Sequence, residues 1–131
     1  MIPEKYLDLF GNDKKAYASL ATVMPDGSPQ VTLVWFEHDH GKILVNSAKG
    51  RVKTRNMSVG SKVALLVVDP ENPYRTVQVR GTVTHSTEEG GDAHADKLTK
   101  KYLGLDSYPY RQPGEVRVIF TIEPTSVAVM G

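Results

Sequence analysis

Hydrophobic and polar residues alternate along much of the chain with the period of two that is typical of half-buried β-strands. This pattern predicts strands over residues 17–23, 29–38, 42–47, 62–69, 74–86, 116–123 and 126–130. Residues 29–38 alternate most fully, and their side chains divide into two faces, with Gln30, Thr32, Val34 and Phe36 on one and Val31, Leu33 and Trp35 on the other. Residues 63–68 are continuously apolar, which predicts a strand buried on both faces.

Turn signals separate these strands. The Asp26-Gly27 pair tolerates the positive φ of a tight turn, and residues 39–41 give a second turn signal. Gly81 marks a predicted bend within its strand, and Pro124 separates the last two strands. The pattern is therefore that of consecutive antiparallel strands.

Short helices are predicted over residues 3–10 and 51–58, and a longer one between a cap at Thr87 and a stop at Gly104. Strands and helices do not alternate, as they would in a parallel sheet. Six or seven strands with two or three short helices predict a mainly β fold, an antiparallel β-barrel. The length of 131 residues fits one domain over residues 1–131.

Composition excludes several classes of function. The formal net charge of +1 argues against a non-specific nucleic-acid partner, which usually needs a strongly basic surface. The absence of cysteine excludes disulfides, thiolate metal ligands and a cysteine nucleophile. No apolar run approaches the roughly 18 residues of a membrane span, and the first residues lack the pattern of a signal peptide. We therefore expect a cytoplasmic protein without a membrane partner.

One segment departs from the balanced charge of the chain. No carboxylate lies between His40 and Asp69, whereas that interval holds six cations: Lys42, Lys49, Arg51, Lys53, Arg55 and Lys62. Arg51 and Arg55 form a like-charge pair at helical spacing, which costs a few tenths of a kcal/mol. The N–H groups at the start of the predicted helix, together with convergent Arg and Lys side chains, are the ingredients of a phosphate site, and Gly50 lets the backbone approach closely. A solvated basic face is the alternative interpretation, and charge alone does not choose between them.

Other candidate sites are weaker. His38 and His40 flank a predicted turn, and no third metal ligand is identifiable, so we expect no metal site. His85 and His94 have no nucleophile or acid at a recognisable catalytic spacing. Residues 106–110 either pack their tyrosine rings on the barrel or line a pocket. The lack of an acid–base constellation fits an enzyme whose cofactor carries the chemistry.

The order of these segments resembles the split β-barrel of the pyridoxamine 5'-phosphate oxidase superfamily, the flavin mononucleotide (FMN)-binding split-barrel-like fold. The resemblance covers nearly the whole chain and is carried by residues 20–22, 25–29, 31–36, 41–53, Asn56, 63–65, 69–70 and 79–81. It is greatest to the branch that binds the deazaflavin coenzyme F420. It also implies a homodimer whose cofactor cleft lies between two subunits.

The resemblance implies roles for particular residues. Arg51 and Lys53 would hold the cofactor phosphate, Ser47, Ala48 and Gly50 would give nearby contacts, and Gln30 and Thr32 would lie toward the redox ring. Lys49 and Arg55 would meet the acidic tail of F420. Thr76 stands where many flavin-binding relatives have a ring-contacting Gln, and the chain lacks the Arg/His-rich C-terminal motif of true pyridoxamine-phosphate oxidases.

The implied activity is that of an oxidoreductase in which reduced F420 transfers hydride to a small electrophilic acceptor. Two alternatives remain at this point. One is an FMN-dependent oxidoreductase of the same fold, and the other is a non-catalytic carrier of F420 or FMN, or a tetrapyrrole binder.

Overall fold

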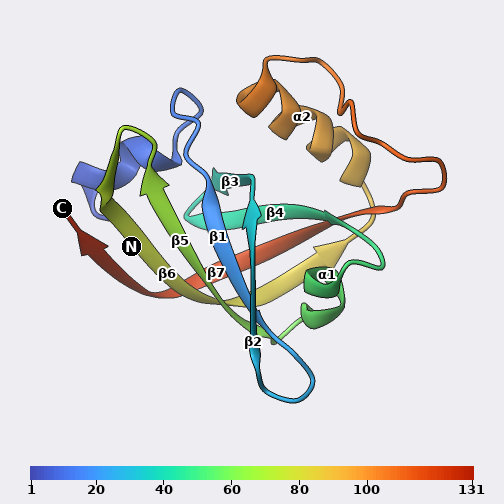
Figure 1. Cartoon of the computed structure of the whole chain (residues 1–131), viewed down its shortest axis with the longest axis horizontal. Coiled ribbons are helices and arrows are strands. Elements are labelled where there is room, and N and C mark those ends of the chain that lie inside the picture. The colour runs from blue at the N-terminus through green and yellow to red at the C-terminus, as the bar shows by residue number, and fades with distance from the viewer.

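A computed structural model describes all residues, 1–131, and its seven strands form a single antiparallel sheet (Figure 1). The strands are β1 (Ala18–Val23), β2 (Pro29–Val34), β3 (Phe36–Asp39), β4 (Lys42–Ala48), β5 (Lys62–Asp69), β6 (Asn72–Thr87) and β7 (Arg117–Met130). The helices are η1 (Glu4–Phe10), α1 (Val52–Asn56) and α2 (Gly91–Leu103). No helix is both long and apolar enough to cross a membrane.

The sheet curls until its two edges meet. The strand order is β2-β1-β5-β6-β7-β4-β3, so the two edge strands are β2 and β3. These strands are consecutive in the chain and are joined through Trp35 alone, which requires the edges to lie next to each other. The predicted antiparallel split barrel with short helices is confirmed, and α2 and η1 lie on opposite sides of it in the view of Figure 1.

The core lies inside the curled sheet and follows the predicted alternation. Leu20, Leu65, Val79 and Phe120 are among the inward side chains that are almost completely buried. Each such side chain contributes about 1.5–3 kcal/mol when it is fully buried. The burial of β5 on both faces, predicted from its apolar run, is wrong, because Leu66 on its outer face is exposed. The outer face of this part of the sheet is thus apolar and uncovered.

Two predicted strand boundaries are also wrong. The strand predicted over residues 29–38 breaks at Trp35, where the chain passes from one edge of the sheet to the other. The two strands predicted on either side of Pro124 are one strand, β7. Pro124 pairs with Gly81 at a register shift, where a residue without a backbone N–H is tolerated. A Cβ on Gly81 would lie 2.6 Å from the carbonyl oxygen of Glu123, so the two strands approach closely at the predicted bend.

The helices are shorter than predicted. The first is a 3₁₀ helix, and α1 is a single turn of five residues. The long helix begins at Gly91 rather than after Thr87, whose hydroxyl instead accepts a hydrogen bond from the Glu89 N–H in the preceding turn. Gly90 caps α2 in the left-handed conformation at φ 76°, which is a glycine-favouring region.

Candidate functional site

A cavity of about 160 Å³ lies where β2 passes into β3, beside α2 and the start of β7. Its apolar wall comes from the β2–β3 junction and from Ala95 and Leu98 of α2. Its polar wall comes from Asn46 of β4, Arg51 and Lys53 at α1, and Arg117 of β7. Tyr108 and Tyr110 complete the lining from the loop after α2. The cavity therefore combines aromatic surface with three cations.

Two of the predicted phosphate ligands lie in this cavity without an acidic partner. Arg51 and Lys53 form no ion pair in the chain, whereas the neighbouring Lys49 pairs with Glu88 at 2.6 Å. Burial lowers the pKa of the Lys53 amine, and the charges of Arg51 and Arg117 lower it further. A half-buried amine surrounded by cations lacks a counter-charge, and a bound anion would supply one.

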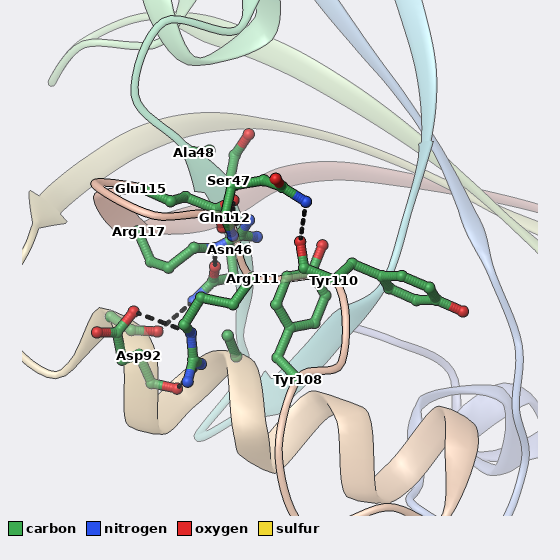
Figure 2. A network of polar contacts seen from close by, with 12 residues as sticks. Asn46, Ser47, Ala48, Asp92, Tyr108, Tyr110, Arg111, Gln112, Glu115 and Arg117 are labelled. Carbon is green, nitrogen blue, oxygen red and sulfur yellow. Dashed lines mark hydrogen bonds and ion pairs between the residues drawn. The ribbon is translucent and has the colours of Figure 1, made fainter.

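Arg117 is a site residue that sequence reasoning missed. It is only 7% exposed, and its Nε donates a 2.7 Å hydrogen bond to Oδ1 of Asn46 while its Nη1 donates at 2.7 Å to Glu115. Figure 2 shows these contacts beside Tyr108, whose ring centroid lies 5.0 Å from the guanidinium carbon. The Nη2 group makes no hydrogen bond within the chain. An arginine in the apolar run 116–120 was the one signal that could have identified it.

The Glu115 carboxylate forms an ion pair with Arg117. Burial is the largest single effect and raises the pKa of Glu115, but the hydrogen bonds from Arg117 and the Gln112 backbone and the charges of Arg117 and Arg51 together outweigh it and lower the pKa. The Glu115 carboxylate thereby compensates the positive charge of Arg117, and Arg51 and Lys53 are the cations that remain unpaired in the cavity.

Ser47, Ala48 and Gly50 position α1 rather than line the cavity. The Thr54 hydroxyl donates to the Ala48 carbonyl at 2.7 Å and lies 2.9 Å from the buried Ser47 hydroxyl. Gly50 turns the chain at φ 92°, which brings Arg51 to the start of α1. Because α1 has only five residues, the helix-terminus part of the predicted phosphate site is not supported, and the side-chain cations are the part that the structure retains. Arg55 is exposed on the same helix and forms no ion pair.

Gln30 and Thr32 point into the barrel beneath α1. The Thr22 hydroxyl donates to Gln30 at 2.8 Å and accepts from Asn56 of α1 at 3.0 Å. The Thr32 hydroxyl is buried and has no hydrogen-bond partner. Such orphaned groups are uncommon in native proteins, and a ligand atom is one way to satisfy them. Neither Gln30 nor Thr32 lines the cavity, so their predicted place beside a redox ring stays a prediction.

Thr76 is not brought to this cavity within one chain. It pairs with Val68 and Met130 near the start of β6, whereas the cavity lies near Arg117 at the start of β7. His38 points toward the core against Phe10, with ring centroids 5.3 Å apart, and His40 is exposed beside Asp39. These two histidines thus point in different directions.

The aromatic residues form a continuous wall. Trp35 stacks on Tyr102 at a centroid distance of 5.1 Å, and the edge of Tyr108 meets Trp35 at 6.3 Å. Both interpretations of residues 106–110 hold, because Tyr108 packs on the barrel and also lines the cavity. Flat aromatic surface beside unpaired cations suits a ligand that has a ring system and an anionic group.

The curled antiparallel sheet, with the cavity at its edge, defines the class of the protein as a split β-barrel. The chain belongs to the pyridoxamine 5'-phosphate oxidase family, whose sequence model matches residues 4–131.

Individual relatives refine this placement. A pyridoxine/pyridoxamine 5'-phosphate oxidase of Rhodopseudomonas palustris is 34% identical over 112 residues, which cover 83% of this chain and 51% of the relative. The chain spans about half the length of the curated relatives it matches. The solved structure of an F420 reductase is 35% identical, covers 97% of this chain and 98% of its own, and superposes with a TM-score of 0.81.

More distant structures share the fold alone. HutZ, the haem storage protein from Vibrio cholerae, is 17% identical, with a TM-score of 0.69 over 100% of this chain and 96% of its own. The same barrel thus occurs in oxidoreductases and in a protein that stores a tetrapyrrole.

Proposed function

We propose that the protein is an oxidoreductase that uses reduced coenzyme F420 to transfer hydride to a small electrophilic acceptor. The observation that carries this proposal is the pair of unpaired cations, Arg51 and Lys53, in a cavity with aromatic walls. The similarity to an F420 reductase over almost the full length of both chains supports the choice of deazaflavin. Residues 1–131 would act as one cofactor-binding domain.

The residues on the cavity wall have separable roles in this proposal. Arg51 and Lys53 hold the cofactor phosphate, which fixes the ring relative to the acceptor. Trp35, Tyr108 and Tyr110 exclude water from the reacting groups. The cofactor supplies the hydride when it is bound, and the chain supplies orientation and charge.

FMN is the second candidate cofactor, because the curated relatives are oxidases of pyridoxamine phosphate and the barrel resembles FMN-binding ones. A carrier of F420, FMN or a tetrapyrrole is the third, since the fold also occurs in a haem storage protein. Turnover separates an enzyme from a carrier, because only an enzyme oxidises reduced F420 faster when an activated alkene or quinone is added.

A homodimer is part of the proposal. Val31 and Leu33 on the outer face of β2 are each 65% exposed. Two rows of side chains run across the three strands β2, β1 and β5. One row is Leu33, Ser19 and Leu66, and the other is Val31, Ala21 and Ala64. Rows of small and apolar side chains on a flat face suit packing against a second sheet. A hollow of about 660 Å³ beside this face, lined in part by Ala21 and Ala64, would be closed by the partner subunit.

Neutral variants test the anion site. Arg51→Gln or Lys53→Gln should weaken F420 binding roughly tenfold to a hundredfold, because each removes a charge-assisted contact of about 1.5–3 kcal/mol. Titration of F420 fluorescence measures this. Lys42→Gln is the matched control, since Lys42 is an exposed cation at the other end of β4. Equal affinity of all three variants and the parent would place the phosphate elsewhere.

A further inference from the structure

A chain of hydrogen bonds leads from the outside of α2 to Arg117 in the cavity. Lys97 of α2 forms an ion pair with Glu37 of β3, and Glu37 lies 3.1 Å from Nε2 of His94. Nδ1 of His94 lies 3.1 Å from Nδ2 of Asn46, and Oδ1 of Asn46 accepts the 2.7 Å bond from Arg117. His94 is buried and does not itself line the cavity, but it contacts Asn46, which does.

The groups at the two ends of this series of hydrogen bonds determine which atom donates and which accepts in each bond. A guanidinium can only donate, so the Asn46 oxygen must face Arg117 and its amide nitrogen must face His94. The Asn46 nitrogen donates one proton to the Gly91 carbonyl at 2.9 Å and the other to Nδ1 of His94. Nδ1 must therefore be unprotonated, and Nε2–H donates to Glu37.

We propose that His94 is a positioning residue whose unprotonated Nδ1 orients Asn46 and thereby aims Arg117 at an anion in the cavity. When His94 is protonated, its Nδ1–H needs an acceptor, and the Asn46 amide is the group that faces it. Rotation of the amide then turns an N–H group toward the Arg117 Nε–H, and two donors cannot bond. Protonation of His94 thus removes the hydrogen bond that holds the Arg117 Nε, while Nη1 stays paired with Glu115, and the less precisely aimed guanidinium binds an anion more weakly.

The charges around His94 place this change below neutral pH. The groups that face the ring are Glu37 from β3, Lys97 from α2 itself and Arg117 from β7. Burial lowers the pKa of His94, which outweighs the opposite effect of Glu37, and the two cations lower it further. At neutral pH the ring is therefore unprotonated and Arg117 is held in place.

The hydrogen-bond order can be tested without any ligand. Nitrogen-15 NMR of the apo protein at neutral pH should show an unprotonated Nδ1 and a protonated Nε2 for His94, together with a slowly exchanging Arg117 Nε–H signal. Acidification should shift that arginine signal with the midpoint of the His94 titration. The opposite tautomer of His94, or an Arg117 Nε–H signal that does not shift with the His94 titration, would overturn the proposal.

Anion binding provides the functional readout. Sulfate is the probe, because its charge stays constant over the pH range used. Its affinity should fall roughly tenfold as His94 is protonated, the effect of losing one well-placed charged hydrogen bond. Direct attraction by the new imidazolium charge predicts the reverse, so an affinity that rises on acidification contradicts the proposal.

Variants separate positioning from folding. His94→Leu should lose about tenfold in sulfate affinity at every pH, because no acceptor remains for Asn46. His94→Asn supplies a carbonyl oxygen that does not titrate, so it should restore affinity at neutral pH and abolish the pH dependence. His85→Asn is the matched control, because His85 is exposed on β6, and it should keep the parent's pH profile. A His94→Asn profile identical to the parent's would refute the role of His94.

Only the extension to cofactor binding rests on the proposed function, and the two can fail separately. If sulfate and the Arg117 signal follow His94 but F420 does not bind, the proposed cofactor is wrong and the positioning role stands. If F420 binds with an affinity that His94→Leu does not change, the positioning role is wrong and the cofactor assignment stands.

Discussion

At the scale of single residues, the site is defined by which charges have partners. Lys49, Arg111 and Arg117 each have an acidic partner, whereas Arg51 and Lys53 have none. The basic segment was predictable because its residues are adjacent in sequence. Asn46 and Arg117 were not, because β4 and β7 bring them together only through the pairing of Ala48 with Arg117.

The half-buried amine of Lys53 predicts an alkaline limit to anion binding. Its pKa lies below the ordinary lysine value of about 10.4, so the neutral form, which cannot attract a phosphate, is reached at a lower pH. F420 affinity should therefore fall as the pH rises toward that value. Lys53→Arg keeps its charge, so the alkaline decrease in F420 affinity, measured by fluorescence titration, should be absent from this variant. The same alkaline decrease in the parent and in Lys53→Arg would show that a group other than Lys53 causes it.

His94 also links stability to pH. Its pKa in the folded protein is below the unfolded value of about 6.5, so between the two values the unfolded chain binds more protons. The contribution of His94 to the free energy of unfolding should therefore be constant above about pH 6.5 and decrease as the pH falls through the folded pKa. Urea denaturation at a series of pH values measures this. His94→Asn should make the decrease smaller than in the parent, and the part that remains is expected from His38, whose pKa is also lowered by burial. A parent stability that rises on acidification in this window would contradict the sign.

At the scale of elements, the alternation of residues predicted nearly every strand. The errors came from tertiary constraints that a local pattern does not contain. The break at Trp35 exists because the sheet closes there, and β7 continues through Pro124 because a register shift accommodates it. The start of α2 is set by its contact with β7, because a Cβ on Gly91 would lie 2.3 Å from the Arg117 carbonyl oxygen.

Gly91→Ala tests this contact. The added methyl group meets backbone atoms that cannot rotate away, so α2 and β7 must separate and the Asn46–Arg117 bond should be disturbed. We expect a loss of stability of about 1–3 kcal/mol, typical of overpacking, together with weaker anion binding. Gly11→Ala is the control, since its φ is −83° and its nearest neighbouring atom would be 3.7 Å away. Equal thermal stability of both variants would mean that the helix start is not constrained by β7.

At the scale of the whole molecule, the exposed apolar face of β2, β1 and β5 predicts a two-fold homodimer. Val31→Asp would place a charge on the edge strand of that face, so it should give a monomer in sedimentation velocity at micromolar concentration. Val129→Asp makes the same change at another exposed strand position, near the C-terminus, and should remain a dimer. A parent protein that is monomeric while it binds cofactor at full stoichiometry would exclude the shared cleft.

Titration of the same apo protein with F420 and with FMN tests the central claim most directly. The account predicts that F420 binds more tightly than FMN, and that Lys53→Gln weakens F420 binding by roughly tenfold or more while Lys42→Gln does not. Tighter binding of FMN would contradict the cofactor assignment and leave the anion site intact. Unchanged binding of both cofactors to Lys53→Gln would contradict the site itself.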